Sequence, residues 1–187
     1  MAATDGAAWA PGIQVLIPEA EVRARVAALG AEIARDYAGR QLTVLCVLKG
    51  ASLFTADLVR AIPLPLTLEF LGVASYGADT RSSGEVRITT DTQTPLHGRD
   101  VLVVEDIVDS GLTLRFLLQA LAARGCRSVR VCALLDKPAR RMDPTVAVHY
   151  RGFSVDDRFL VGYGLDHAER WRNLPFIGVL EEPEAAR

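Results

Sequence analysis

An apolar strand that ends in two adjacent carboxylates is the feature of this sequence with the clearest chemical potential. Val101–Val104 is a continuous apolar run, Glu105 and Asp106 follow it, and the small-residue turn Asp109–Thr113 leads into a helix. In an open parallel sheet, ligands bind where strands end and helices begin. Backbone N–H groups, two hydroxyls and a helix N-terminus in such a turn together suit a phosphate group.

The two carboxylates need a partner other than the phosphate, because they would repel an anion. Vicinal ribose hydroxyls and a hydrated Mg²⁺ are both good partners for Glu105 and Asp106. A phosphate beside a diol implies a ribose 5-phosphate. The sequence has neither G-x-G-x-x-G nor G-x-x-x-x-G-K-[ST], so dinucleotide and P-loop sites lack support. A helix cap with surface acids would explain Asp109 alone, but not the other two acids.

Lysine usage singles out two further positions. Of the 21 basic residues, 19 are arginine, and the two lysines are Lys49 and Lys137. A chain this rich in arginine keeps lysine where a compact, rotatable ammonium is needed, although two surface lysines can also survive by chance. Each lysine follows an apolar strand, where α/β proteins place ligand groups. We therefore count both as candidate binding residues.

Strands alternate with helices along the chain, which predicts a parallel sheet with crossover helices. The expected helices are an amphipathic one carrying Val22 to Tyr37, one at Gly50–Ala61 and one at Thr113–Arg124. The expected strands are Ile13–Ile17, Leu42–Leu48, Leu64–Val73, Glu85–Thr90, Val101–Val104, Ser128–Leu135, Val146–Tyr150, Phe159–Gly162 and Phe176–Leu180. The late short strands, with the first one, suggest a smaller lobe over one edge. Residues 74–99 form a long polar excursion, typical of a lid or hairpin arm and otherwise a solvated loop.

The composition is that of an ordinary globular chain. Its 187 residues are 50% hydrophobic and 24% charged, which is enough apolar material for a buried core. A net charge of −2 without a basic tract argues against broad nucleic-acid binding. The N-terminal segment lacks the pattern of a signal peptide, and the apolar run Leu42–Leu48 is far too short to span a membrane. Three cysteines without metal or redox spacing predict free thiols, two of them buried, in a cytoplasmic protein.

The stretch Val101–Leu114 resembles the phosphoribosyl pyrophosphate (PRPP) motif of type I phosphoribosyltransferases. Four further segments resemble the 6-oxopurine branch of that family: Leu48–Ala51, Ser75–Gly77, Leu135–Pro138 and Phe159–Pro175. The similarity runs from about Ile13 to Leu180. It implies the type I phosphoribosyltransferase fold, an α/β fold whose central, mostly parallel sheet is flanked by helices and carries a small hood lobe from the N- and C-terminal segments. We expect a single domain over residues 1–187, with a core at about 20–145, a hood at about 10–18 plus 146–180, and disordered ends.

This resemblance implies a Mg²⁺-dependent reaction of purine salvage, in which the 5-phosphoribosyl group of PRPP passes to hypoxanthine, guanine or both, giving IMP or GMP and pyrophosphate. Asp109 would be the catalytic base or acid at purine N7, and a carboxylate suits proton exchange with a ring nitrogen. Glu105 and Asp106 would hold the ribose hydroxyls, directly or through Mg²⁺, and Asp166 would be a further metal ligand. The residues implied to bind PRPP and its phosphates are Lys49, Gly50, Glu105, Asp106, Asp109, Ser110, Gly111, Leu112, Thr113 and Arg172. The resemblance also implies a non-proline cis peptide at Leu48–Lys49.

The residues implied to bind the purine are Lys137, Phe159, Leu160 and Asp166. Lys137 would donate to purine O6, and because an ammonium is a donor only, it favours a 6-oxo group over the 6-amino group of adenine. Phe159 would stack on the purine, although without the resemblance an ordinary core aromatic is the better interpretation. Asp166 could equally be a surface acid that caps a helix through Arg172. Ser75 and Tyr76 would form a lid over PRPP and pyrophosphate.

Two other functions stay open at this point. An RNA-binding regulator of nucleotide genes built on the phosphoribosyltransferase fold would share the acidic strand motif, but we would expect it to carry a basic face. A nucleotide-binding domain without chemistry would not need Asp109 within the motif. The sequence does not rank hypoxanthine, guanine and xanthine. Because relatives form dimers or tetramers, we expect a homodimer or homotetramer, with no membrane and no nucleic-acid partner.

Overall fold

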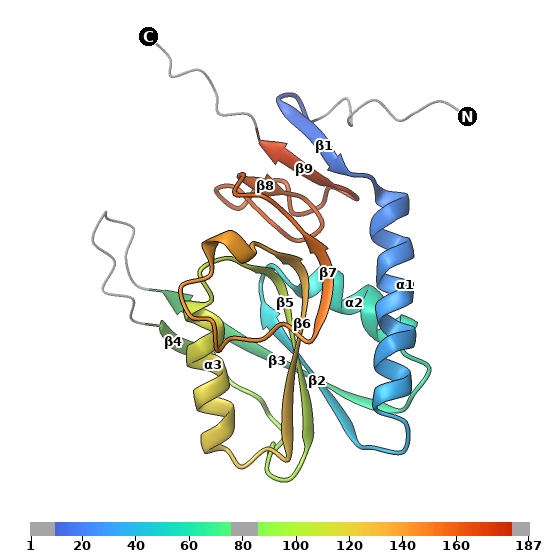
Figure 1. Cartoon of the computed structure of the whole chain (residues 1–187), viewed down its shortest axis with the longest axis vertical. Helices are drawn as coiled ribbons and strands as arrows, with labels where there is room; N and C mark the ends of the chain where they lie inside the picture. Colours follow the sequence, from blue (N-terminus) through green and yellow to red (C-terminus); the bar gives the residue numbers. More distant parts are fainter. Residues whose placement is uncertain (1–9, 76–85, 181–187) are drawn as a thin grey trace.

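A mostly parallel sheet with helices on both faces forms the body of the protein. The computed structural model describes residues 10–75 and 86–180 (Figure 1). The sheet strands are β2 (Leu42–Leu48), β3 (Leu66–Ser75), β4 (Val86–Thr90), β5 (Asp100–Val108), β6 (Ser128–Asp136) and β7 (Tyr150–Ser154). Within the described residues their order is β4-β3-β2-β5-β6-β7, and the pairs from β3 to β7 are parallel while β4 is antiparallel at the edge. The expected fold class is confirmed.

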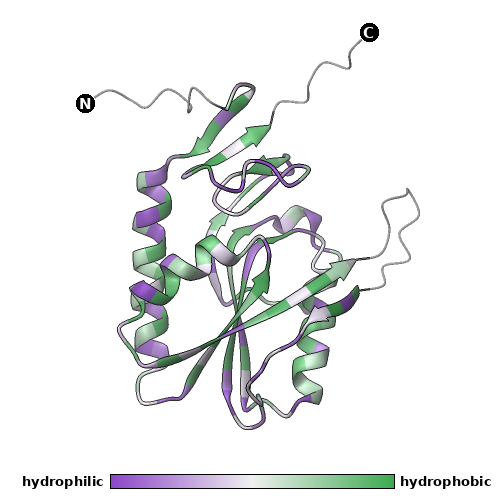
Figure 2. Ribbon diagram, turned by 180° about the vertical axis from the view of Figure 1, so that it is seen from behind, coloured by the Kyte–Doolittle hydropathy of each residue, from purple (hydrophilic) through white to green (hydrophobic). Residues whose placement is uncertain are grey.

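Helices bury the sheet from both sides. Helices α1 (Glu19–Asp36) and α2 (Ser52–Ala61) lie on one face, and α3 (Leu112–Ala123) lies on the other (Figure 1). Leu102 and Val104 of β5 pack in the core under α1 and α2, whereas Val101 and Val103 pack under α3. A strand buried on both faces needs apolar residues at every position, which explains the continuous apolar runs of the sequence and the hydrophobic colouring of the strands in Figure 2.

A second, smaller sheet joins the two ends of the described chain. Its strands are β1 (Ile13–Ile17), β9 (Ile177–Leu180) and β8 (Leu160–Val161), and in the described residues they pair antiparallel in the order β1-β9-β8. A separate apolar cluster around Val161, Leu174 and Phe176 supports this sheet. Two of the three predicted late strands therefore combine with the N-terminal strand in a small sheet, whereas β7 joins the main sheet.

Two strand predictions were wrong. The segment Val146–Tyr150 is mostly loop, and β7 begins at Tyr150 and pairs with β6. Gly152 lies within β7, and a Cβ at that position would lie 2.2 Å from the Leu134 carbonyl oxygen, so this glycine allows β7 to pair closely with β6. Strand β5 also extends four residues beyond Val104, because its pairing with β6 continues to Val108.

Some expectations lie beyond what the structure can address. The expected disordered ends, Tyr76 and the start of the strand at Glu85 lie outside the described residues. The division into a core and a hood within one domain stays a prediction.

The cysteine and membrane expectations agree with the structure as far as it describes the chain. Cys46, Cys126 and Cys132 are unpaired thiols, and Cys46 and Cys132 are buried as expected. In the described ranges, no helix has both the length and the apolar character that crossing a membrane requires.

Helix α1 approaches α2 closely at Gly30. A Cβ at this buried glycine would lie 2.4 Å from the carbonyl oxygen of Ala61 and 2.6 Å from its Cβ. Ala61 is the last residue of α2, and the first residue of this helix, Ser52, directly follows the turn after β2. The position of α2 therefore depends on the absence of a side chain at residue 30.

We expect Gly30→Ala to destabilise the protein by about 1–3 kcal/mol, because the added methyl group must push the two helices apart. Helix propensity alone predicts the opposite sign, a gain of about 1 kcal/mol. Urea unfolding followed by circular dichroism measures the difference. Ala28→Gly on the exposed face of the same helix is the control, with an expected loss of about 1 kcal/mol. A Gly30→Ala variant at least as stable as the wild type would contradict the close approach.

Candidate active site

The carboxyl ends of β2 and β5 meet at the point where the chain connections diverge. From β2 the chain continues through α2 to β3 on one side, and from β5 it continues through α3 to β6 on the other. Open α/β sheets bind ligands at such a switch point. Lys49 and Gly50 follow β2 here, and the end of β5 with the turn after it contributes Glu105 to Thr113.

The acid pair lies inside the last part of β5. Glu105 is 7% exposed, and among the described residues its carboxylate receives no hydrogen bond. Burial raises the pKa of Glu105 well above its usual range, and the charge of Asp106 raises it further. Burial also raises the pKa of Asp106, although the Ile107 N–H donates to its Oδ1 at 2.8 Å. A cation or hydroxyl donors would favour the ionised form of both groups.

Glu105 and Asp106 are better placed to hold a magnesium ion than Asp166, the third metal ligand that the resemblance implies. Carboxylate oxygens are the ligands Mg²⁺ prefers, and Glu105 and Asp106 are buried acids that need a positive partner. Asp166 is engaged elsewhere, because its Oδ1 lies 2.8 Å from Arg172 Nη2 and its Oδ2 accepts from the Glu169 N–H at 2.8 Å. In the part of the chain that the structure describes, no three potential ligands form a cluster. Asp166 therefore does not complete a three-ligand cluster with the acid pair, although after burial its charge contributes to the raised pKa of Asp106.

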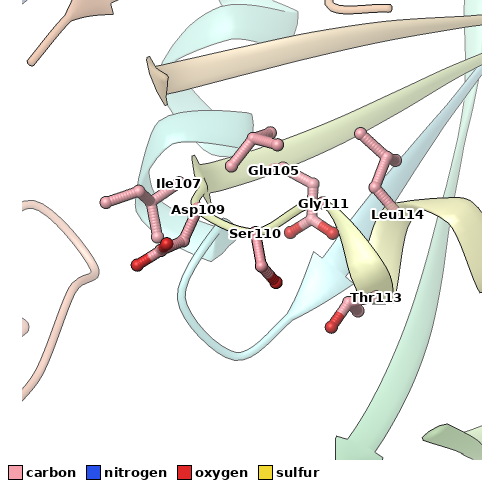
Figure 3. A pocket seen from close by; sticks show the side chains of 8 residues that line it. Glu105, Ile107, Asp109, Ser110, Gly111, Thr113 and Leu114 are labelled. Carbon is pink, nitrogen blue, oxygen red and sulfur yellow. The ribbon is translucent and has the colours of Figure 1, made fainter. Parts of the chain in front are cut away.

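The turn after β5 has the form that the sequence predicted for a phosphate site. Gly111 adopts φ +81° just before α3, and the Leu112 N–H donates to Ser110 Oγ at 3.4 Å. Figure 3 shows the hydroxyls of Ser110 and Thr113 projecting to the same side of this turn. A pocket of about 100 Å³ is lined by Glu105, Ile107, Val108, Asp109, Ser110, Gly111, Thr113 and Leu114. One acid of the pair, Asp109 and the phosphate turn thus share one pocket.

Gly50 is the point where three segments come together. A Cβ on Gly50 would lie 1.6 Å from Asp106 Oδ2, so the Asp106 carboxylate can keep this orientation beside the end of β2 only with glycine at this position. A Cβ on Gly164 would lie 1.9 Å from the Gly50 carbonyl oxygen, so the loop after β8 also packs against this turn. The Leu48–Lys49 peptide is cis, as the resemblance implied.

The two residues implied to bind pyrophosphate share a carboxylate. Lys49 Nζ lies 3.3 Å from both carboxylate oxygens of Glu169, and Arg172 Nη2 lies 3.3 Å from Glu169 Oε2. The hydrogen bond from Lys49, followed by that from Arg172, lowers the pKa of Glu169. Arg172 Nη1 also donates to the Gly164 carbonyl at 2.8 Å. Lys49 and Arg172 are therefore side by side, as a diphosphate would require.

The buried end of β6 carries Lys137. Its side chain is 8% exposed, and its Nζ lies 3.2 Å from Asp157 Oδ1 and 3.6 Å from Asp109 Oδ2. Arg140 also contacts both acids, with Nε 3.0 Å from Asp109 Oδ1 and Nη1 3.4 Å from Asp157 Oδ2. The four side chains form a ring of alternating charge, which we call the Lys137 ring. Lys137 and Asp109, predicted as separate purine contacts, are thus brought together.

The structure describes three of the four remaining predicted site residues. Phe159 is 52% exposed, so it is not a core aromatic, and its ring meets His167 edge-on with centroids 5.3 Å apart. Leu160 is buried in β8. Ser75 is the last residue of β3, and its lid partner Tyr76 lies outside the described residues. The lid therefore stays a prediction.

The sequence analysis missed Asp157, Arg140 and Glu169. All three are charged loop or turn residues of a kind that is common on surfaces. The available signal was their spacing, because each lies two or three residues from a predicted site residue: Phe159, Lys137 and Asp166, respectively. Spacing of this kind does not show which way a side chain points.

Comparisons with known proteins agree with this arrangement. Residues 18–168 match the phosphoribosyl transferase domain family. The hypoxanthine-guanine phosphoribosyltransferase of Mycobacterium tuberculosis is 50% identical over 173 residues, which cover 89% of this chain and 85% of that protein. The enzyme of the same name from Bacillus subtilis is 48% identical over 168 residues, covering 90% and 93%.

Solved structures show the same fold. A hypoxanthine phosphoribosyltransferase from Staphylococcus aureus superposes with a TM-score of 0.86 at 39% identity, covering 90% of this chain and 91% of that one. A hypoxanthine-guanine phosphoribosyltransferase from Bacillus anthracis gives a TM-score of 0.85 at 42% identity, covering 90% and 98%. The resemblance drawn from the motifs is confirmed, and the chain belongs to the phosphoribosyl transferase domain family.

Proposed function

We propose that this protein is a purine salvage enzyme that transfers the 5-phosphoribosyl group of PRPP to hypoxanthine, guanine or both. The observation that carries the proposal is the meeting of three features at one edge of the sheet. These are the buried acid pair of β5, the phosphate turn that follows it and the buried ammonium of Lys137. Relatives about half identical to this chain are named for this activity.

PRPP would bind along the switch point. Its 5-phosphate would lie at the turn Ser110–Thr113, where two hydroxyls project to the same side and α3 begins. Glu105 and Asp106 would accept hydrogen bonds from the ribose hydroxyls. Lys49 and Arg172 would bind the diphosphate in place of Glu169. Mg²⁺ held by the acid pair would neutralise part of the diphosphate charge.

The transfer exchanges one bond at ribose C1 for another. The bond from C1 to the pyrophosphate oxygen breaks, and pyrophosphate leaves with the electron pair. The bond from C1 to purine N9 forms, and the purine loses one proton, which Asp109 would accept at N7. Positive charge develops at C1 in the transition state, so the work of the protein is to position the reactants and to balance charge.

Recognition of the base would depend on Lys137. Its buried ammonium can donate to a 6-oxo group, whereas the 6-amino group of adenine would leave both donors unpaired. The exposed ring of Phe159 is free to stack on a purine, and the Leu160 backbone would meet the base edge. Asp166, held by Arg172 beside this loop, would complete the purine site.

The proposal includes a cytoplasmic location and self-association. Three free thiols are typical of a reducing compartment. Leu68 and Phe70 lie on the same face of β3 and are 37% and 43% exposed, which supports burial against a second copy in a homodimer or homotetramer.

Nucleotide formation from PRPP and Mg²⁺ tests the activity. Hypoxanthine, guanine, xanthine, adenine and uracil would be offered separately and the products separated by chromatography. We expect IMP, GMP or both, without AMP or UMP, because Lys137 selects a 6-oxopurine. UMP formation, or PRPP binding without any product, would contradict the proposal and favour a regulator.

We expect Asp109→Asn to lower kcat by about 10²–10⁴-fold, the usual contribution of a general acid or base. The dissociation constant of PRPP, measured by calorimetry, should change far less, because the phosphate turn and the acid pair are intact. Asp156→Asn removes the same charge from an exposed loop position and should leave both quantities unchanged. Normal turnover by Asp109→Asn would remove Asp109 from the chemistry.

A further inference from the structure

We propose that Asp157 is a positioning residue that determines base selectivity. It holds the Lys137 ammonium toward purine O6 and prevents that ammonium from pairing fully with Asp109. This inference rests on the proposed function and adds to it a residue outside the predicted site.

Three neighbouring strand ends bring the participants together. Asp109 follows β5, Lys137 follows β6 and Asp157 follows β7. The backbone hydrogen bonds between these strands continue beyond the strand ends. The Lys137 N–H donates to the Val108 carbonyl at 2.9 Å, and the Val155 N–H donates to the Asp136 carbonyl at 2.9 Å. The parallel sheet therefore places one acid on each side of Lys137.

Lys137 is the member of the ring that most needs fixed partners. Its side chain is 8% exposed, whereas those of Asp109 and Asp157 are 42% and 53% exposed. A buried ammonium is stable only when carboxylates or other acceptors replace its water. Asp157 is the nearer acid, at 3.2 Å against 3.6 Å for Asp109. The position of the ammonium is thus a balance between the two carboxylates, weighted toward Asp157.

The backbone of Lys137 is fixed independently of this balance. Asp136, the preceding residue, is 1% exposed and is ion-paired with Arg141 and with Arg151, whose Nε lies 2.7 Å away. Anchoring at Asp136 leaves the far end of the lysine side chain as the part that can move. Asp157 acts on that end.

Lys137 and Arg140 already contact Asp109, and loss of the Asp157 charge would draw both cations more fully toward it. Arg140 contacts the same two acids as Lys137, so each cation would then have Asp109 as its remaining carboxylate in the ring. Without the competing contacts to Asp157, the two cations pair more strongly with Asp109, which then accepts a proton from purine N7 less readily. The ammonium would also shift away from the O6 position. Asp157 therefore influences base binding and proton transfer through its neighbours, and it need not touch the reacting atoms.

Asp156 offers a matched control. It is adjacent, exposed and of the same charge, and within the described residues its side chain makes no hydrogen bond or ion pair. Asp156→Asn therefore produces the same change in net charge, in the same loop, without altering the ring. Asp157→Glu keeps the charge and tests whether a carboxylate alone restores the function.

The experiment is steady-state kinetics of the full chain with Mg²⁺, PRPP and either hypoxanthine or adenine, for the wild type and these three variants. For Asp157→Asn we expect kcat/KM for hypoxanthine to fall about tenfold, the scale of one lost charge-assisted hydrogen bond. The preference for hypoxanthine over adenine should narrow, and the KM for PRPP should stay within about twofold because the phosphate turn is untouched. Asp157→Glu should recover most of the loss, and Asp156→Asn should behave as the wild type.

Each other outcome would overturn the inference in a distinguishable way. If the wild type is active and Asp157→Asn has the same kcat/KM and base preference as Asp156→Asn, the role of Asp157 is overturned and the proposed function is not. If Asp157→Asn lowered kcat/KM equally for hypoxanthine and for PRPP, and Asp157→Glu did not restore either value, the role of Asp157 would be structural and the inference wrong. A wild type inactive with every purine would overturn the proposed function and this inference with it.

Discussion

The site depends on the close approach of the end of β2 to the end of β5. The parallel pairing of the two strands sets this approach, and Gly50 leaves room for the Asp106 carboxylate, which a Cβ there would overlap. Gly164 then lets the loop after β8 close over the same turn. With this contact in place, Lys49 lies beside Glu169 and Arg172, and the buried acids lie beneath them. These close contacts bring together charged groups that are far apart in the sequence, as the proposed binding of PRPP requires.

Charge balance explains how the same site can be stable without substrate. Without a cation or a diol, the Glu105–Asp106 pair shows raised pKa values. The cations in turn are held by internal carboxylates: Lys49 and Arg172 by Glu169, and Lys137 and Arg140 by Asp109 and Asp157. In the proposed function, binding of substrates would exchange these ion pairs for contacts with the diphosphate and the base. For Lys49 and Glu169, whose side chains are 70% and 64% exposed, such an exchange would cost little net free energy, because solvent already screens this pair.

The parts predictable from the sequence were those with local causes. The run Val101–Val104, the acids and the turn Asp109–Thr113 follow one another in the chain, so their chemistry could be inferred before their geometry was known. The start of β7 could not be predicted from the sequence, because it depends on the pairing of β7 with β6, where Gly152 contacts Leu134. The extension of β5 likewise depends on its partner β6. The roles of Asp157 and Glu169 require the direction of side chains that approach from separate loops, and a single sequence does not contain that information. For Phe159, the sequence without the resemblance favoured a position in the core, and its 52% exposure excludes that position.

The most direct test of the central claim is a crystal structure of the protein with IMP. The account predicts the 5′-phosphate on the turn Ser110–Thr113, the ribose hydroxyls at Glu105 and Asp106, and purine O6 about 3 Å from Lys137 Nζ. Asp157 should still contact the ammonium on its other side. IMP bound elsewhere, for example beside Arg40 and Arg127 in the cavity formed with Asp100 and Ser128, would contradict the assignment of this edge as the active site.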